Sequence, residues 1–283
     1  MLRAIRKKLI ALVGLAFLAG LGVWLVRSKT DPRRASTDSS ASLDDRAEQA
    51  PVAADEPADS QPDAMEEASH FAPLRQRMVD TQIQARGIRN AGVLEAMRTV
   101  PRHRFVPPGQ VHAAYNDHPL RIGHGQTISQ PYIVALMTEL AKPTKESIAL
   151  DVGTGSGYQA AVLSNLCKEV YSIEIIESLA NSARQRLEDV GYENLTVRCG
   201  DGYRGWPEKA PFDLIIVAAA PDHVPQPLVD QLREGGRLII PVGSYFQELM
   251  VVEKLPGGKS RAWKKTGVAF VPMTGEAQER RKD

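Results

Sequence analysis

The sequence of 283 residues predicts an α/β protein whose doubly wound, mainly parallel sheet carries an N-terminal helical addition and a C-terminal antiparallel hairpin. From residue 147 onward, short apolar runs alternate with amphipathic segments, which is the pattern of a parallel sheet covered by helices on both faces. The first apolar run, 147–150, enters a glycine-rich turn at 151–157, and a helical pattern follows from Tyr158. A strand, a tight turn and a helix start in this order form a ligand-binding unit of such sheets.

The N-terminal part of the chain begins with an apolar segment. Residues 9–26 are uncharged, and as a helix they would extend roughly 27 Å, close to the thickness of the hydrocarbon core of a bilayer. Four basic residues lie on each side of this run, so the positive-inside rule gives it no orientation. We interpret residues 1–29 as an uncleaved membrane anchor, because the run is longer than a typical signal-peptide core and no A-x-A site ends it. A signal peptide is the alternative.

Residues 30–72 are predicted to be a disordered acidic tether. Positions 35–71 hold ten acidic residues against one basic residue, Arg46, and no aromatic residue occurs between Trp24 and Phe71. Such a composition buries too little apolar area to offset the entropy of ordering. We therefore expect the globular domain to span 73–275, with a charged tail at 276–283.

Helical patterns open the globular domain. One runs from Leu74 to about Arg86, and a second covers 90–98 and is stopped by Pro101. Residues 105–108 indicate a turn or a short extended piece, and 122–131 form a polar, glycine-bearing loop. The next helix holds Pro131 in its first turn, where Ser129 or Gln130 could cap it.

Strands and helices alternate beyond the glycine-rich turn. We expect strands over 168–174, 195–199, 212–218 and 237–242, and helices over 158–166, 176–190 and 224–232. Two final strands, 247–254 and 262–271, would form a hairpin about Pro256-Gly257-Gly258.

The bulk composition excludes several functions. The net charge of +1 gives no indication of nucleic-acid binding. The two cysteines, Cys167 and Cys199, have neither disulfide-framework nor zinc spacing, and the histidines show no metal-ligand spacing, so we expect no metal site.

The spacing of the glycines narrows the ligand class. Gly153, Gly155 and Gly157 let the backbone turn sharply and let a ligand approach the main chain. A dinucleotide fingerprint counted from Gly153 would end in glycine or alanine at position 158, where this chain has tyrosine. A nucleoside or amino-acid-bearing cofactor therefore fits better than a pyrophosphate.

Acidic residues follow two further strands at the edge where ligands bind. Glu174 lies 21 residues after Gly153, a distance suited to the two hydroxyls of a ribose. Asp201-Gly202 follows the next strand, where it suits an adenine amino group. One such acid is more often a solvated loop residue, but acids on successive strand ends indicate a cofactor site.

Four segments together resemble the protein-L-isoaspartate O-methyltransferase family: QTISQPYI at 126–133, LDVGTGSGYQAA at 150–161, GDGYRGWP at 200–207 and FDLIIVAAAP at 212–221. The resemblance covers roughly residues 73–275. It implies a Rossmann-like methyltransferase fold with S-adenosylmethionine as the methyl donor. It also implies methylation of the abnormal carboxylate of L-isoaspartyl residues in damaged proteins, which begins their repair, and a monomeric catalytic domain.

The resemblance also implies roles for individual residues. In the cofactor half, the turn would hold the methionine part, Glu174 the ribose, and Asp201 and Gly202 the adenine; the turn residues concerned are Asp151, Gly153, Gly155 and Gly157. In the substrate half, Ser129 corresponds to the family's active-site serine. The other residues expected to contact the substrate are Gln126, Thr127 and Ile128, in the loop that would cover the active site, and Gln247, which would lie beside the substrate or cofactor pocket. The sequence departs from the family pattern at two places, which affects the assignment of these roles. Ala218 replaces an expected threonine, and residues 243–246 differ from the family loop beside Gln247.

The implied chemistry requires few groups. A substrate carboxylate is already ionised at neutral pH, so no strong general base is needed, and catalysis rests on in-line positioning and exclusion of water. Ser129 would orient the carboxylate or the peptide backbone by hydrogen bonding. It lacks the surroundings of a nucleophilic serine.

Three alternatives share parts of this pattern. A nicotinamide dehydrogenase is disfavoured by the missing third glycine and the lack of a hydride-transfer pair. A nucleic-acid methyltransferase resembling those with an N/D-P-P-Y/F motif is disfavoured because residues 218–221 read AAAP. A tethered peptide-binding module without turnover is the third. Since S-adenosylmethionine is made in the cytosol, we expect a catalytic domain in the cytoplasm, tethered to the membrane through 9–26, with export as the alternative.

Overall fold

The computed structural model describes residue 65 and residues 67–279. The predicted anchor at 9–26, its signal-peptide alternative and most of the predicted tether lie outside these residues. Within the part of the chain that is described, no helix is both long enough and apolar enough to cross a membrane.

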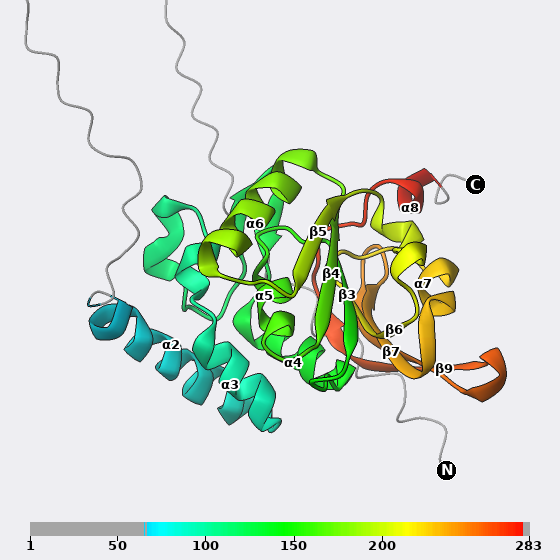
Figure 1. Cartoon of the computed structure of the whole chain (residues 1–283), viewed down its shortest axis with the longest axis horizontal. Helices are drawn as coiled ribbons and strands as arrows, with labels where there is room; N and C mark the ends of the chain where they lie inside the picture. Colours follow the sequence, from blue (N-terminus) through cyan, green and yellow to red (C-terminus); the bar gives the residue numbers. More distant parts are fainter. Residues whose placement is uncertain (1–64, 66, 280–283) are drawn as a thin grey trace, which may run out of the picture. The chain divides into compact units, whose positions relative to one another are not determined.

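A seven-stranded sheet forms the centre of the domain, with the strand order β5-β4-β3-β6-β7-β8-β9 (Figure 1). The five strands from β5 to β7 are parallel, and β8 and β9 extend the sheet as an antiparallel hairpin, so the predicted fold class is confirmed. These strands are β3 (Ile148–Val152), β4 (Glu169–Glu174), β5 (Leu195–Cys199), β6 (Phe212–Val217), β7 (Leu232–Val242), β8 (Gln247–Lys254) and β9 (Ser260–Val268).

Consecutive residues of the central strands pack on opposite faces of the sheet. In β6, Leu214 and Ile216 belong to one buried apolar cluster, whereas Ile215 and Val217 belong to another. All four side chains are fully buried. Strands buried on both faces are continuously apolar, which explains why residues 214–217, LIIV, can be recognised as a strand in the sequence.

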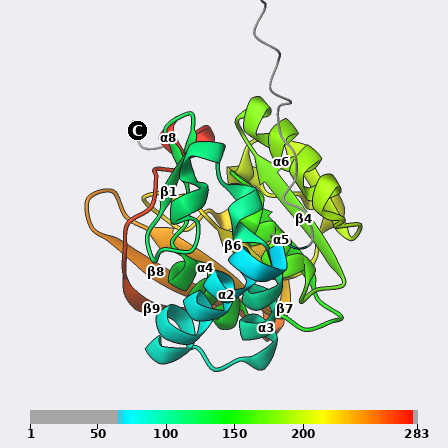
Figure 2. The ribbon, with the colours of Figure 1, turned by 90° about the vertical axis from the view of Figure 1, so that its left-hand side faces the viewer.

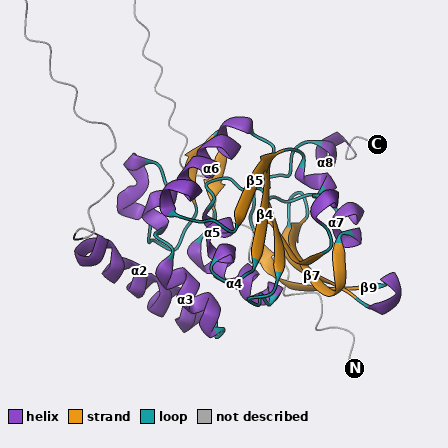
Figure 3. Cartoon of the chain, viewed as in Figure 1, coloured by secondary structure: helices purple, strands orange, loops and turns teal. Residues whose placement is uncertain are grey.

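Helices lie on both sides of the sheet (Figure 3). These helices are α4 (Pro131–Ala141), α5 (Tyr158–Ser164), α6 (Glu177–Val190), α7 (Gln226–Asp230) and α8 (Glu276–Glu279). Short 3-10 turns cover Gly202–Arg204, Pro207–Lys209 and Pro256–Gly258. The predicted helix at 224–232 is shorter, because β7 already begins at Leu232 and reaches its pairing with β6 through an irregular register.

The N-terminal addition packs α2 (Ala72–Met78) beside α3 (Ala91–Thr99), as two views show (Figures 1 and 2). The single helix predicted over 74–86 is broken: α2 passes into a π-helical turn, Val79–Ile83, and a 3-10 turn, Gln84–Arg86. Two further 3-10 turns follow α3, at Arg102–Phe105 and Pro108–Ala113.

Residues 67–72, which precede the predicted boundary at residue 73, pack against the domain. A π-helical turn, Glu67–Phe71, precedes α2. Phe71 is 6% exposed and its ring stacks on His103 at a centroid distance of 3.7 Å. Glu67 accepts a hydrogen bond of 2.6 Å from Arg75 Nη1. Their composition assigned these residues to the tether, but the packing of the Phe71 ring on His103 attaches them to the domain. At the other end, α8 occupies part of the predicted tail.

The predicted loop at 122–131 contains a small hairpin. Strands β1 (Leu120–Gly123) and β2 (Gln126–Ile128) pair antiparallel across a turn in which Gly123, His124 and Gly125 all have positive φ. Pro131 is the first residue of α4, as predicted, and Gln130 is its N-cap residue. The Gln130 side chain does not cap the helix, because it binds Asp117 instead.

Candidate functional site

A pocket with an open volume of about 830 Å³ lies at the carboxyl ends of β3, β4 and β6. Its lining joins three parts of the chain: the glycine-rich turn, the end of the β1–β2 hairpin, and a C-terminal segment, 271–274. The sheet changes its direction of progression between β3 and β6, which is the topological switch point at which open α/β sheets bind ligands.

The glycine-rich turn presents main chain to this pocket. Gly153, Gly155 and Gly157 have φ angles of 92°, 52° and 92°, in the left-handed region that glycine adopts without strain. Gly153 and Gly155 line the pocket, whereas Gly157 is the N-cap residue of α5. A Cβ on Gly157 would lie 3.2 Å from Leu187 Cδ1 of α6, so this glycine also permits close helix packing.

Glu174 holds the glycine-rich turn in place while lining the pocket. Its Oε2 accepts a hydrogen bond of 2.8 Å from the Gly155 amide, and its Oε1 accepts one of 3.0 Å from the Ile176 amide. The side chain is nearly buried. Each oxygen keeps a lone pair, so the carboxylate can still accept hydrogen bonds from a diol.

Asp151 lies next to the pocket but is not part of its lining. Its side chain is fully buried, its Oδ2 accepts a hydrogen bond of 2.7 Å from Ser172, and its Oδ1 has no hydrogen-bond partner. Burial raises the pKa of Asp151 to about 7; the bond from Ser172 lowers it and the charge of Glu174 raises it further. An orphaned buried carboxylate oxygen indicates a place for a hydrogen-bonding or cationic ligand.

Asp201 binds the C-terminal segment. Its Oδ1 accepts a hydrogen bond of 2.9 Å from the Tyr203 amide, and its Oδ2 accepts one of 2.8 Å from the Glu276 amide at the start of α8. Of the predicted adenine pair, therefore, Gly202 lines the pocket and Asp201 does not. A Cβ on Gly202 would lie 2.4 Å from Val152 Cγ1, so only glycine fits this position.

The predicted substrate residues of strand β2 and its end all line the pocket: Gln126, Thr127, Ile128 and Ser129. Ile128 is buried, and Ser129 is half-buried. The carbonyl oxygen of Ser129 accepts a hydrogen bond of 2.8 Å from Arg102 Nη2. The side-chain Nε2 of the next residue, Gln130, donates to the carboxylate of Asp117 at 2.8 Å.

Gln247 does not line this pocket. Its Nε2 donates to the Phe270 carbonyl at 2.9 Å and its Oε1 accepts from the Phe270 amide at 2.6 Å, so the side chain ties β8 to the segment after β9. It borders a smaller pocket that shares Pro272 and Met273 with the larger one.

The motifs do not predict that residues 271–274 form a wall of the pocket. Pro272 forms an isolated bridge with Ala220, and the amides of Ala220 and Met273 donate to carbonyls of the opposite segment. One signal in the sequence is the proline that follows the apolar stretch 268–271, since a proline ends regular pairing. Among the described residues, no group of three histidine, cysteine or acidic side chains could hold a metal ion.

Comparison with known proteins agrees with this geometry. The family described as Protein-L-isoaspartate(D-aspartate) O-methyltransferase matches residues 74–278. The chain belongs to the protein-L-isoaspartate(D-aspartate) O-methyltransferase family. It is 54% identical over 213 residues to Protein-L-isoaspartate O-methyltransferase 2 of Shewanella sediminis (strain HAW-EB3), covering 75% of this chain and 87% of that protein.

Two solved structures of protein-L-isoaspartate O-methyltransferases are similar to this chain. One has a TM-score of 0.67 and 29% identity and covers 74% of this chain and 69% of that one. The other, from Plasmodium falciparum, is in complex with S-adenosyl-L-homocysteine. It has a TM-score of 0.62 and 26% identity and covers 71% of this chain and 98% of that one.

Proposed function

We propose that this protein transfers a methyl group from S-adenosylmethionine to the carboxylate of L-isoaspartyl residues in damaged proteins and peptides. The observation that carries the proposal is that the cofactor half and the substrate half predicted from the sequence meet in one pocket. Gly153, Gly155, Glu174 and Gly202 line one part of it, and residues 126–129 line another.

The pocket fits the methyl donor. The glycine-rich turn would hold the methionine part against bare main chain, the remaining lone pairs of Glu174 would accept the ribose hydroxyls, and adenine would lie beside Gly202. The unpartnered oxygen of Asp151, behind the turn, remains free to accept a hydrogen bond. When bound, S-adenosylmethionine supplies a methyl group activated by a sulfonium.

The lining matches a reaction that needs no general base. Among the residues that line the pocket, Glu174 is the only acidic one, and none is lysine, arginine or histidine. An isoaspartyl carboxylate is ionised at neutral pH and can attack without losing a proton. The hydroxyls of Thr127 and Ser129 can donate hydrogen bonds that orient the carboxylate. Catalysis then comes from alignment and from the exclusion of water by the surrounding apolar side chains.

The test compares two peptides that differ only in one linkage. The full chain is incubated with S-adenosylmethionine carrying a labelled methyl group and with an isoaspartyl peptide or its aspartyl counterpart. We expect base-labile label on the isoaspartyl peptide alone. Binding of that peptide without transfer would contradict the proposal and favour a peptide-binding module. Equal labelling of both peptides would contradict the substrate assignment.

We further propose that the catalytic domain faces the cytoplasm and is tethered to the membrane through residues 9–26. The support is that S-adenosylmethionine is a cytosolic cofactor and that the segment is apolar over a bilayer-spanning length. A topology reporter fused after Asp283 tests this proposal. Activity of a reporter that works only outside the cytoplasm would favour export.

A further inference from the structure

Arg102 lies behind the pocket and is fully buried. It belongs to the 3-10 turn Arg102–Phe105 that follows α3. Its Nε donates a hydrogen bond of 2.8 Å to the Ala114 carbonyl, and its Nη2 donates one of 2.8 Å to the Ser129 carbonyl. Its guanidinium carbon lies 4.7 Å from the centre of the Tyr158 ring.

The surroundings of Arg102 are unusual for a buried charge. It takes part in no ion pair among the described residues, and its Nη1 has no hydrogen-bond partner. Burial lowers the pKa of Arg102 to about 10, so the side chain remains charged at neutral pH. A buried charge with incomplete partners costs stability, and an apolar side chain of similar volume would pack at least as well. Stability alone therefore does not account for an arginine here.

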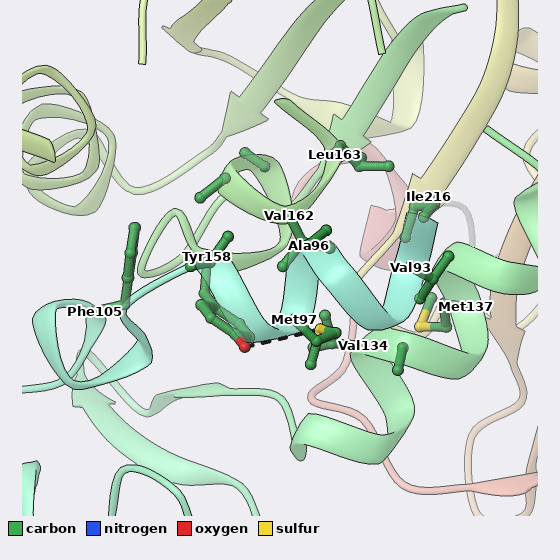
Figure 4. Close-up of a cluster of buried hydrophobic side chains, with 14 of the residues drawn as sticks. Val93, Ala96, Met97, Phe105, Val134, Met137, Tyr158, Val162, Leu163 and Ile216 are labelled. Carbon is green, nitrogen blue, oxygen red and sulfur yellow. Dashed lines mark hydrogen bonds between the residues drawn. The ribbon is translucent and has the colours of Figure 1, made fainter. Parts of the chain in front are cut away.

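Arg102 contacts two residues, Ser129 and Tyr158, that belong to different parts of the pocket lining. Ser129 ends the β1–β2 hairpin on the substrate side. Tyr158 opens α5 directly after the glycine-rich turn and also lines the pocket. Figure 4 shows Tyr158 fixed in the core, with its ring near Phe105 and its hydroxyl directed at Met97, at 3.8 Å from the sulfur. Arg102 thus joins the loop that carries Ser129 to a rigid element.

A second contact holds the next residue of the same loop. Gln130 Nε2 donates to both the carbonyl and the carboxylate of Asp117, at 3.0 and 2.8 Å. Arg86 pairs with that carboxylate at 2.6 Å and stacks over Tyr132. These bonds fix the side following Ser129, whereas Arg102 alone among these side chains binds the Ser129 main chain itself.

We propose that Arg102 is a positioning residue for methyl transfer, which holds the Ser129 carbonyl so that the Ser129 hydroxyl is directed at the substrate carboxylate. This inference rests on the proposed function. Arg102 does not line the pocket, so it acts through Ser129 rather than on the substrate.

The test uses Arg102→Met and Arg102→Lys in the full chain, with Arg237→Met and Arg237→Lys as matched controls. Arg237 is also a largely buried arginine that donates to a backbone carbonyl, that of Leu140 at 3.1 Å, and lies near an aromatic ring, Trp263. Unlike Arg102, it pairs with a carboxylate, that of Glu253, and makes no hydrogen bond to the loop that carries Ser129. Three quantities are measured: kcat and KM for an isoaspartyl peptide, the Kd for S-adenosylmethionine, and amide hydrogen exchange of residues 120–132.

We expect Arg102→Met to lower kcat for the peptide about 10- to 100-fold, the loss that a misplacement of about 1 Å produces. The Kd for S-adenosylmethionine should stay within threefold, and exchange at 120–132 should accelerate. Arg102→Lys keeps the charge but cannot reach both carbonyls as the guanidinium fork does, so it should be intermediate. The Arg237 variants should change neither kcat nor exchange at 120–132.

Several results would overturn the inference. These are unchanged kcat in Arg102→Met, a parallel loss of cofactor affinity, slow turnover without faster exchange at 120–132, and full activity of Arg102→Lys. If Arg102→Met does not fold, Arg102→Lys carries the same comparisons. A wild-type protein without turnover would refute the proposed function instead, and the exchange experiment would still show whether Arg102 holds the loop.

Discussion

Replacement of Gly153 by alanine tests whether the glycine-rich turn is a ligand site or only a turn. Gly153 has a φ of 92° and lines the pocket. An added Cβ would lie 3.6 Å from the Cβ of Ala218, which is ordinary van der Waals contact, so the fold has room for the methyl group. Because Ala218 also lines the pocket, that methyl group would occupy the wall against which a ligand must lie.

Gly191 provides the matched control. It is the C-cap residue of α6, its φ is 93°, and nothing lies within 4 Å of an added Cβ. Since the two φ angles are nearly equal, each alanine should cost a similar backbone strain, about 1–2 kcal/mol. In a domain of this size that strain lowers Tm by about 2–8 °C.

Calorimetric titration with S-adenosylmethionine and thermal melting separate the two effects. We expect both variants to melt at similar, lowered temperatures. Gly153→Ala should bind the cofactor at least about tenfold more weakly, which corresponds to about 1.4 kcal/mol, while Gly191→Ala should bind it as the wild type does. Equal affinities in the two variants would refute the assignment of the turn to cofactor binding.

Three further predictions concern acidic and hydroxyl side chains of the site. Glu174→Gln offers one acceptor oxygen to the two amides that now bind it, so we expect a loss of about 1–3 kcal/mol in unfolding free energy and weaker cofactor binding in the same titration. Asp151 keeps its proton in the native state up to pH 7, whereas the unfolded chain releases it near pH 4, so its contribution to the unfolding free energy falls by up to about 1.4 kcal/mol per pH unit across that window. Urea unfolding from pH 4 to 8 measures this. The unfolding free energy of Asp151→Asn, relative to that of the wild type, should rise up to pH 7 and then stay constant. Ser129→Ala should lower kcat for an isoaspartyl peptide by about 10- to 100-fold in a steady-state assay, with the cofactor Kd unchanged.

Controls exist within the same chain. Glu139 accepts two backbone amides, those of Arg89 and Asn90, on a single oxygen at 2.7 Å each, and it does not line the pocket. Glu139→Gln can keep both bonds and should leave cofactor affinity and stability close to those of the wild type. A constant difference between Asp151→Asn and the wild type from pH 4 to 8 would contradict the raised pKa, and a Ser129→Ala variant that binds cofactor poorly would contradict the division of the pocket.

The sheet and the glycine-rich turn could be predicted from the sequence because both are local patterns. Residues 214–217 are apolar on both faces of their strand, and the glycines of the turn at 153–157 all have positive φ. The β1–β2 hairpin could not be predicted in the same way. Its cross-strand pair, Leu120 and Ile128, is separated by polar and glycine residues whose composition indicates a loop.

Long-range partners account for the site residues that differ from expectation. The carboxylate of Asp201 accepts a hydrogen bond from the backbone amide of Glu276, 75 positions later, and no residue near Asp201 in the sequence predicts this contact. Arg102 lies in the stretch PRHRF, whose three basic side chains suggest an exposed surface, yet its own side chain is fully buried. Composition gives an average environment for a segment, whereas burial is decided residue by residue in the packed chain.

The two halves of the pocket differ in how they are built, and this difference explains what the motifs could identify. The cofactor half consists of strand ends and a turn, whose geometry follows from nearby residues such as Gly155 and Glu174. The substrate half is a loop whose position depends on side chains from elsewhere, through Arg102 to Ser129 and Asp117 to Gln130. Motifs therefore show which ligand the first half suits. The alignment of a substrate carboxylate with the methyl group depends on side chains, such as Arg102, that touch neither substrate nor cofactor. Residues of this kind are found from buried donors bound to loop carbonyls, which only the folded chain reveals.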